Sequence, residues 1–238
     1  MTTRSLKLNS SEVFLVEANM ECKGNSIFRS SDLHDEAGAI SVEMGRGTAH
    51  PFRYGGKNMV FKHYSRGGLL SKIVDDKYIW LTLEQTRSFA EFRALSKIHG
   101  LSLPVPKPVA ARATRRLGLY TADLITEKIE NAKTLGNYLD NRFLTKKISS
   151  AVGKTIKKFH EKAIYHPDLN VENIMIDDDE NVFLLDFDKF KVQKLNKRSG
   201  LQNIHRLDRS MRKKSISDGQ PFPQEQWEHI VESYEAPK

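Results

Sequence analysis

The alternation of hydrophobic and polar positions in the first half of the chain is typical of β-strands. Two runs, 48–54 and 58–64, alternate loosely and flank Gly55-Gly56, which predicts a hairpin. Further extended stretches are predicted at 13–16, 104–113 and 117–125.

Apolar residues return every three to four positions in other segments, which predicts helices. One helix interrupts the first half over 84–99, and we expect Gly100 to follow its last residue as the C-terminal cap. Its buried arc is expected to hold Phe92, Leu95, Ile98 and His99. The second half predicts helices at 134–140, at 146–162 and around 227–234, with a short hairpin at 173–176 and 182–185. A mainly β first half and a mainly α second half predict an α+β fold.

Composition places the chain among folded proteins. Of its 238 residues, 39% are hydrophobic and 29% are charged, which fits neither a disordered nor a collagen-like chain. The one cysteine, Cys22, cannot form an internal disulfide, which favours a reducing compartment. We expect neither a membrane span nor export, because no apolar run approaches about 18 residues and the N-terminus lacks a signal-like stretch.

Positive charge is concentrated in one segment, which we call the basic tract: Lys189–Lys214. It holds ten basic residues and one acidic residue, Asp208, against a net charge of +8 for the whole chain. Nucleic acid, an anionic lipid surface or a phosphorylated substrate would suit such a tract. A solvated basic face with no partner is the alternative.

The most informative motif runs from His166 to Asn173. Asp168 and Asn173 are five residues apart, and Asp186 follows a strand-like run thirteen residues later. This spacing resembles the catalytic Asp, the metal-binding Asn and the strand-end metal Asp of protein kinases. Phosphoryl transfer needs such groups: Asn173 and Asp186 offer oxygen ligands to Mg²⁺, while Asp168 orients the acceptor hydroxyl and accepts its proton. His166 is expected to brace the loop.

Two residues of the first half match a second kinase feature. Val60, Lys62 and Tyr64 are expected on one strand face, because side chains alternate across a strand. Glu91 falls on the buried arc of the next helix, where a carboxylate needs a cation, so Lys62 and Glu91 are predicted to pair and hold the α- and β-phosphates of ATP. Glu84, two turns earlier, is the rival partner.

Two other stretches are candidate nucleotide contacts by position. Gly45-Arg46-Gly47-Thr48 precedes the hairpin and could cover phosphates with backbone N–H groups, although a plain tight turn is the alternative. Glu127 lies at the strand-to-helix crossover where a hinge would hold adenine.

The chain departs from protein kinases at three points. Pro167 stands where an arginine is usual, Asp188 stands where a glycine follows Asp-Phe, and no Ala-Pro-Glu comes after. The parts that would clamp a phosphorylated loop and dock a peptide are therefore missing, and a non-protein acceptor is predicted.

Several separated segments resemble the 3-deoxy-D-manno-octulosonic acid (Kdo) kinases and their lipopolysaccharide-core relatives, over roughly residues 42 to 235. They are Lys62–Leu69, Thr86–Phe92, Leu103–Pro108, Leu124–Ile129 and His166–Asn170. The resemblance implies a two-lobed protein-kinase-like fold, with a mainly β lobe over 1–127 holding one main helix and a mainly α lobe over 128–238, together one domain.

The resemblance also implies transfer of the ATP γ-phosphate to the 4-hydroxyl of Kdo on a lipid A precursor. The enzyme would be peripheral, at the cytoplasmic face of the inner membrane of Gram-negative bacteria, with the basic tract on anionic lipid and Arg66 near the substrate. No nucleic-acid partner and no obligate protein partner are predicted; a single Arg-Gly-Gly copy is poor support for nucleic acid. The alternatives are a heptose kinase of the lipopolysaccharide core, or a noncatalytic basic module that binds membrane or nucleic acid.

Overall fold

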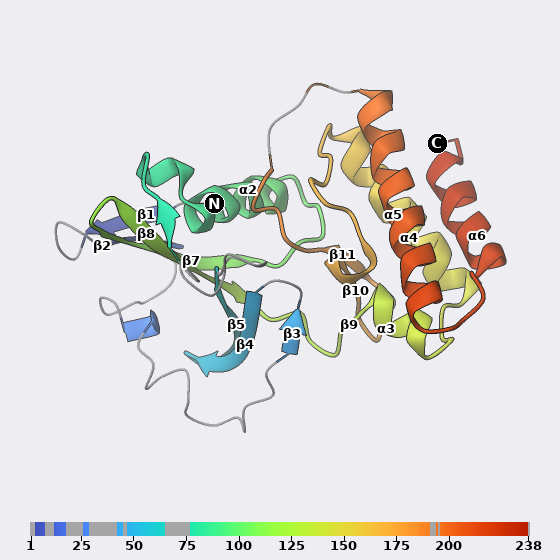
Figure 1. The fold of residues 1–238 in the computed structure, drawn as a ribbon, viewed down its shortest axis with the longest axis horizontal. Helices are drawn as coiled ribbons and strands as arrows, with labels where there is room; N and C mark the ends of the chain where they lie inside the picture. The colour runs from blue at the N-terminus through green and yellow to red at the C-terminus, as the bar shows by residue number, and fades with distance from the viewer. Residues whose placement is uncertain are drawn as a thin grey trace. The chain divides into compact units, whose positions relative to one another are not determined.

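The computed structural model describes residues 3–7, 12–17, 26–28, 42–44, 47–64, 77–190, 194 and 196–237. Gly45, Arg66 and Cys22 lie outside the described residues. The chain divides into two compact units (Figure 1): the first is Met1–Gly100 with Pro106–Lys128, and the second is Leu101–Val105 with Ile129–Lys238. Whether the whole forms one kinase-like domain divided at residue 127 stays a prediction.

The first unit is built on an antiparallel sheet in the order β1-β2-β7-β8-β5-β4-β3, with β6 paired to β8. The predicted hairpin is confirmed as β4 and β5, and Gly55 and Gly56 turn between them with positive φ of 57° and 77°, which glycine adopts without strain. The strands are β1 (Thr3–Lys7), β2 (Glu12–Glu17), β3 (Val42–Met44), β4 (Gly47–Tyr54), β5 (Lys57–His63), β6 (Tyr78–Ile79), β7 (Pro108–Arg116) and β8 (Leu119–Glu127).

One helix, α2 (Arg87–Gly100), packs against β7 and β8 and buries Phe89, Phe92, Leu95 and Ile98. It begins three residues later than predicted, because Leu83–Gln85 forms a separate 3-10 turn, η3, and Thr86 is extended. A second 3-10 turn, η1 (Ser26–Phe28), contributes Ile27 and Phe28 to an apolar cluster with Phe52, Met59, Val109, Ala110 and Ile125.

Two expectations for the end of α2 are wrong. His99 is exposed, because it lies in the last turn, one residue before the helix ends. Gly100 is itself the last helical residue, and the positive φ of 57° falls on Ser102.

The second unit is mainly helical. Its predicted helices and hairpin are confirmed, and α6, red in Figure 1, packs against α4. A small sheet has the order β11-β10-β9. The elements are β9 (Lys133–Thr134), α3 (Leu135–Asp140), α4 (Lys146–Glu161), η4 (Val171–Asn173), β10 (Ile174–Ile176), β11 (Val182–Leu184), α5 (Lys197–Ser217) and α6 (Gln224–Glu235).

The main element that the hydrophobic pattern failed to indicate is α5, which contains much of the basic tract. Its buried side holds Ile204, Leu207 and Met211, but also Gly200, Asn203 and Ser215. Because half of this stripe is small or polar, the helical period is weak on a hydropathy scale. In coarse terms the α+β prediction is confirmed: an antiparallel sheet comes first and a helical part follows.

Candidate active site

In the first unit, Lys62 and Glu91 form the predicted ion pair. Lys62 Nζ lies 2.8 Å from Glu91 Oε2, which joins strand β5 to helix α2. Glu91 is only 2% exposed, whereas the Lys62 side chain is 27% exposed. Removing Lys62 would therefore leave the Glu91 carboxylate as an uncompensated charge in a buried place. The rival Glu84 is exposed and pairs with Arg93 instead.

Tyr64 is a site residue that our sequence reasoning missed. Its buried hydroxyl donates a hydrogen bond to Glu91 Oε2, the oxygen that also accepts from Lys62. Lys62 Nζ lies 4.8 Å from the centre of the Tyr64 ring, which adds a cation–π contact. The signal was available, because the strand alternation already put Tyr64 on the face of Lys62.

Glu127 and the glycines of the Gly45–Thr48 stretch were predicted as nucleotide contacts from their positions alone. Glu127 ends β8, and its carboxylate is held by Lys57 at 2.8 Å and Lys107 at 3.3 Å. Although partial burial opposes the charged form, these two cations hold the pKa of Glu127 below its usual value. Gly47 opens β4 and pairs with Met44 across the β3–β4 ladder, while Gly45 lies outside the described residues.

In the second unit, side-chain and backbone bonds join the members of the His166–Asn173 loop. Asn173 Nδ2 donates to the Asp168 carbonyl at 2.9 Å, which turns the amide oxygen of Asn173 away from that carbonyl. Asn170 caps η4 by accepting from the backbone N–H groups of Glu172 and Asn173. Asp168 is exposed, so its carboxylate is accessible to a substrate.

The backbone of Leu185 ties Asp186 to this loop. Leu185 N–H donates to the Asn173 carbonyl at 2.9 Å, and the Leu185 carbonyl accepts from His166 Nε2 at 2.5 Å. The next residue, Asp186, has a φ of 61°, a left-handed conformation that a non-glycine residue adopts only under local constraint. The network therefore places Leu185, the residue before Asp186, against Asn173, and Asp168 lies on the same loop as Asn173.

His166 acts as a brace, as expected. It is 3% exposed, and burial lowers the pKa of its imidazole, although Asp186 and Asp168 work in the opposite direction. Because Nδ1 accepts from the Asp168 N–H at 3.1 Å, the ring is neutral and carries its proton on Nε2, which donates to Leu185.

Asn203, on α5, is a second residue that sequence reasoning missed. It is buried, its side-chain oxygen accepts the His166 N–H at 2.8 Å, and its Nδ2 donates to the His166 carbonyl at 2.9 Å. The same oxygen accepts from His160 Nε2 at 3.1 Å. Arg206, one turn later, donates to the Pro167 carbonyl. Helix α5 thus holds the His166–Asn173 loop through hydrogen bonds from Asn203 and Arg206, which its sequence pattern did not indicate.

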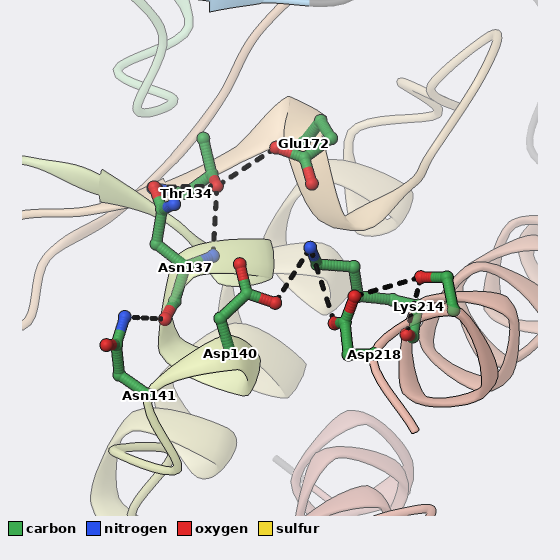
Figure 2. Close-up of polar contacts among 8 residues, drawn as sticks. Thr134, Asn137, Asp140, Asn141, Glu172, Lys214 and Asp218 are labelled. Carbon is green, nitrogen blue, oxygen red and sulfur yellow. Dashed lines mark hydrogen bonds and ion pairs between the residues drawn. The ribbon is translucent and has the colours of Figure 1, made fainter. Parts of the chain in front are cut away.

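Part of the basic tract is neutralised within the fold. Figure 2 shows Lys214 between Asp140 of α3 and Asp218, at 2.7 and 3.4 Å, and these bonds raise the pKa of Lys214. The same figure shows Thr134 donating to Glu172 of the loop at 3.1 Å. Lys214 therefore holds α5 against α3.

Comparison with known proteins shows to which family this chain belongs. The model of the lipopolysaccharide kinase (Kdo/WaaP) family matches residues 32–234. This chain belongs to that family. It is 41% identical to a 3-deoxy-D-manno-octulosonic acid kinase of Actinobacillus succinogenes over 188 residues, 76% of each chain.

Two other relatives of this chain carry the same name. A 3-deoxy-D-manno-octulosonic acid kinase of Haemophilus influenzae strain PittGG is 36% identical over 224 residues, 89% of this chain and 91% of that one. One of Vibrio cholerae is 38% identical over 175 residues, 74% of each. The resemblance stated from the sequence is confirmed.

Proposed function

We propose that this chain is an ATP-dependent kinase that transfers the γ-phosphate to the 4-hydroxyl of Kdo on a lipid A precursor, in lipopolysaccharide core biosynthesis. The observation that carries the proposal is the identity with 3-deoxy-D-manno-octulosonic acid kinases over up to nine-tenths of both chains. Family membership also favours a two-lobed protein-kinase-like fold.

The donor set of the loop fits Mg²⁺. Asn173 has its amide nitrogen engaged by the Asp168 carbonyl, so its oxygen is the atom left for a metal, and Asp186 adds a carboxylate. These are the hard oxygen donors that Mg²⁺ prefers. When bound, Mg²⁺ would neutralise charge on the ATP phosphates. Asp168, exposed on the same loop, would accept the proton of the acceptor hydroxyl.

In the first unit, Lys62 would bind the α- and β-phosphates of ATP, with Glu91 and Tyr64 fixing its ammonium. Gly45 and Gly47 would approach the phosphates through their backbone. The carboxylate of Glu127 is engaged by two lysines, so its contact with adenine would come from the backbone. Arg66 remains a proposed substrate contact outside the described residues.

An anionic membrane surface is the proposed docking partner, at the cytoplasmic face of the inner membrane. Within the described residues, no helix is long and apolar enough to cross a bilayer. On α5 the exposed residues Arg198, Arg209 and Lys213 fall within about 60° of one another at helical spacing. Leu201 and Ile216 on the same side are 51% and 78% exposed. Cationic and apolar groups on one helix face suit an interfacial contact with anionic lipid.

Incubation of the purified protein with labelled ATP, Mg²⁺ and a Kdo-lipid A precursor tests the activity. We expect label on the 4-hydroxyl of Kdo, and labelling slower by about 10²–10⁴ with Asp168→Asn, a variant of nearly the same size. Label only on a heptosylated core acceptor would make the enzyme a heptose kinase. No transfer to either acceptor by folded protein would favour a noncatalytic basic module.

A further inference from the structure

A small cavity lies beside the loop that carries Asp168, wholly within the second unit. Its volume is about 200 Å³, and we call it the loop cavity. It is lined by Tyr165 and Pro167 before Asp168, by Lys189 after Asp186, and by Gln202 and Arg206 of α5. Neither the proposed phosphoryl transfer nor the membrane contact uses it.

The lining is cationic. Lys189 and Arg206 are both exposed, and no aspartate or glutamate is among the residues that line the loop cavity. Within the described ranges, no ion pair joins either cation to an acidic side chain. The guanidinium of Arg206 donates one N–H to the Pro167 carbonyl and has further donors for a ligand.

The loop cavity also has neutral hydrogen-bond donors. Gln202 is exposed and has an amide N–H₂ group, and Tyr165 accepts a bond from the Asn196 N–H at 2.6 Å, which leaves its own O–H proton to donate. The first-turn N–H of Arg198 is already capped by Asn196, so positive charge comes from side chains and not from the helix end. Two cations with two neutral donors form a site for an oxyanion.

The size of the loop cavity narrows the ligand. About 200 Å³ is below the roughly 300–1,000 Å³ of pockets that bury whole small molecules. One water molecule takes about 30 Å³, so a phosphate or carboxylate group fits with several waters, whereas a nucleotide or an entire sugar–lipid does not. The occupant is a charged substituent of something larger, or a free anion.

We propose that the loop cavity binds a phosphate or carboxylate group of the acceptor glycolipid, held by Lys189 and Arg206. This inference rests on the proposed function, because it names how that acceptor is recognised. Arg206 is bonded to Pro167, the residue before Asp168, so an occupant that fixes Arg206 also fixes the loop beside the proposed base. Binding would therefore orient the acceptor and Asp168 together.

The first test measures binding of inorganic phosphate alone, which needs no catalysis. Backbone amide shifts of Asp168 and Gln202 are followed by NMR during a phosphate titration of the wild type, Lys189→Gln and Gln202→Glu. We expect saturable shifts in the wild type and at least fivefold weaker binding in both variants. Lys194→Gln, which loses the same charge at an exposed position, should bind like the wild type. Equal affinity in all four proteins would overturn the proposal.

The second test uses the reaction. With Kdo-lipid A precursor, Lys189→Gln and Gln202→Glu should raise KM for the acceptor about tenfold and leave KM for ATP near the wild-type value. Acceptors without the lipid A phosphates, or with the Kdo carboxylate esterified, distinguish the source. The acceptor that lacks the recognised group should show a high KM that neither variant raises further.

Two outcomes separate the loop cavity from the kinase proposal. If the variants no longer bind inorganic phosphate but keep the wild-type KM for every acceptor, the loop cavity binds a free anion and the proposal is wrong. If the wild type transfers no phosphate to Kdo yet binds inorganic phosphate through Lys189, the proposed function fails while the oxyanion site stands.

Discussion

Asp168 and Asp186 are linked through His166 and Leu185, yet the proposed function gives the two carboxylates separate roles at the residue scale. Asp168→Ala should lower kcat by about 10²–10⁴, because a positioned general base typically contributes that much, and should leave ATP affinity largely intact. Asp186→Ala should weaken Mg²⁺-ATP binding as well as turnover, because it removes the carboxylate proposed to bind the metal. Equilibrium nucleotide binding and steady-state kinetics check both, and equal nucleotide affinity in the two variants would contradict the assignment.

Tyr64 gives a second prediction at this scale. Tyr64→Phe removes one hydrogen bond to the buried Glu91 carboxylate, and a bond to a charged group contributes about 1.5–3 kcal/mol. We expect a KM for ATP raised roughly tenfold, because Glu91 then holds Lys62 less firmly. Tyr54→Phe, a partly buried tyrosine on the preceding strand, is the control. An unchanged KM in a variant of lowered stability would make Tyr64 purely structural.

The residues of the candidate site that could be predicted are those whose chemistry follows local periodicity. Strand alternation placed Lys62, helical spacing placed Glu91, and the fixed intervals from Asp168 singled out Asn173 and Asp186. Asn203 could not be found this way, because its partners, His160 and His166, lie about forty positions earlier and meet it only through the packing of α5.

At the scale of elements, the contact between α4 and α6 depends on the absence of a side chain. A side chain at Gly153 of α4 would collide with the Ile230 carbonyl oxygen of α6, because the two backbones approach closely there. Gly153→Ala should lower the free energy of unfolding by about 1–3 kcal/mol through overpacking, although alanine favours an isolated helix by about 1 kcal/mol.

Urea unfolding measures the effect of Gly153→Ala. Lys154→Ala, at the next and exposed position of the same helix, supplies the control and should be neutral or slightly stabilising. A stabilised Gly153→Ala protein would show that α6 moves away from α4 at little cost.

Elements with a clean apolar stripe were predicted, and those with mixed stripes were not. The stripe of α4 contains Ile148, Val152, Ile156 and Phe159, all buried as its spacing indicates. The stripe of α5 contains Ser215 and also Asn203, whose burial is explained by its hydrogen bonds with His160 and His166 instead of hydropathy. Sequence periodicity detects apolar burial only.

At the scale of the whole molecule, two buried histidines make stability depend on pH. Burial lowers the pKa of His160 from 6.5 to about 4, and its bond with Asn203 offsets only part of that shift. Below about pH 6.5 the His160 imidazole therefore binds a proton in the unfolded chain but not in the folded protein. The free energy of unfolding falls on acidification as a result. Between pH 7 and pH 5 the loss is about 2 kcal/mol from His160, and His166 acts in the same direction.

Urea unfolding at pH 5, 6 and 7 tests this. His160→Gln should be less stable at pH 7 but should show a flatter dependence on pH. His205→Gln, an exposed position on α5, should keep the wild-type slope. A wild-type slope in His160→Gln would assign the pH dependence to other groups.

Docking on anionic membrane gives a prediction for the molecule's surface. Replacing Arg198, Arg209 and Lys213 by Gln should weaken binding to anionic vesicles roughly 100-fold at low salt, at about 1 kcal/mol per basic residue. Lys214 is left unchanged because it pairs with Asp140. Cosedimentation measures binding, which should fall with salt, and turnover on a water-soluble Kdo analogue should be spared.

The control for the vesicle experiment removes the same charge elsewhere: Lys97, Lys146 and Lys154, all exposed, are replaced by Gln. Ile216→Ser should reduce the binding that persists at high salt, because its side chain is 78% exposed on the same face. Equal losses in both triple variants would mean that only net charge matters.

The segment Leu101–Val105 affects how the chain folds during its synthesis. It belongs to the second unit, although its neighbours along the chain belong to the first, and the Pro104 carbonyl accepts a bond from the Leu184 N–H. On a ribosome the sheet of the first unit can close once β8 has emerged, but Leu103 and Val105, nearly fully buried in the finished protein, must wait for β11. Because translation adds about 5–20 residues per second, the interval between the synthesis of Val105 and that of β11 is on the order of ten seconds. The apolar side chains of Leu103 and Val105 are therefore expected to stay exposed on the nascent chain until the second unit is complete.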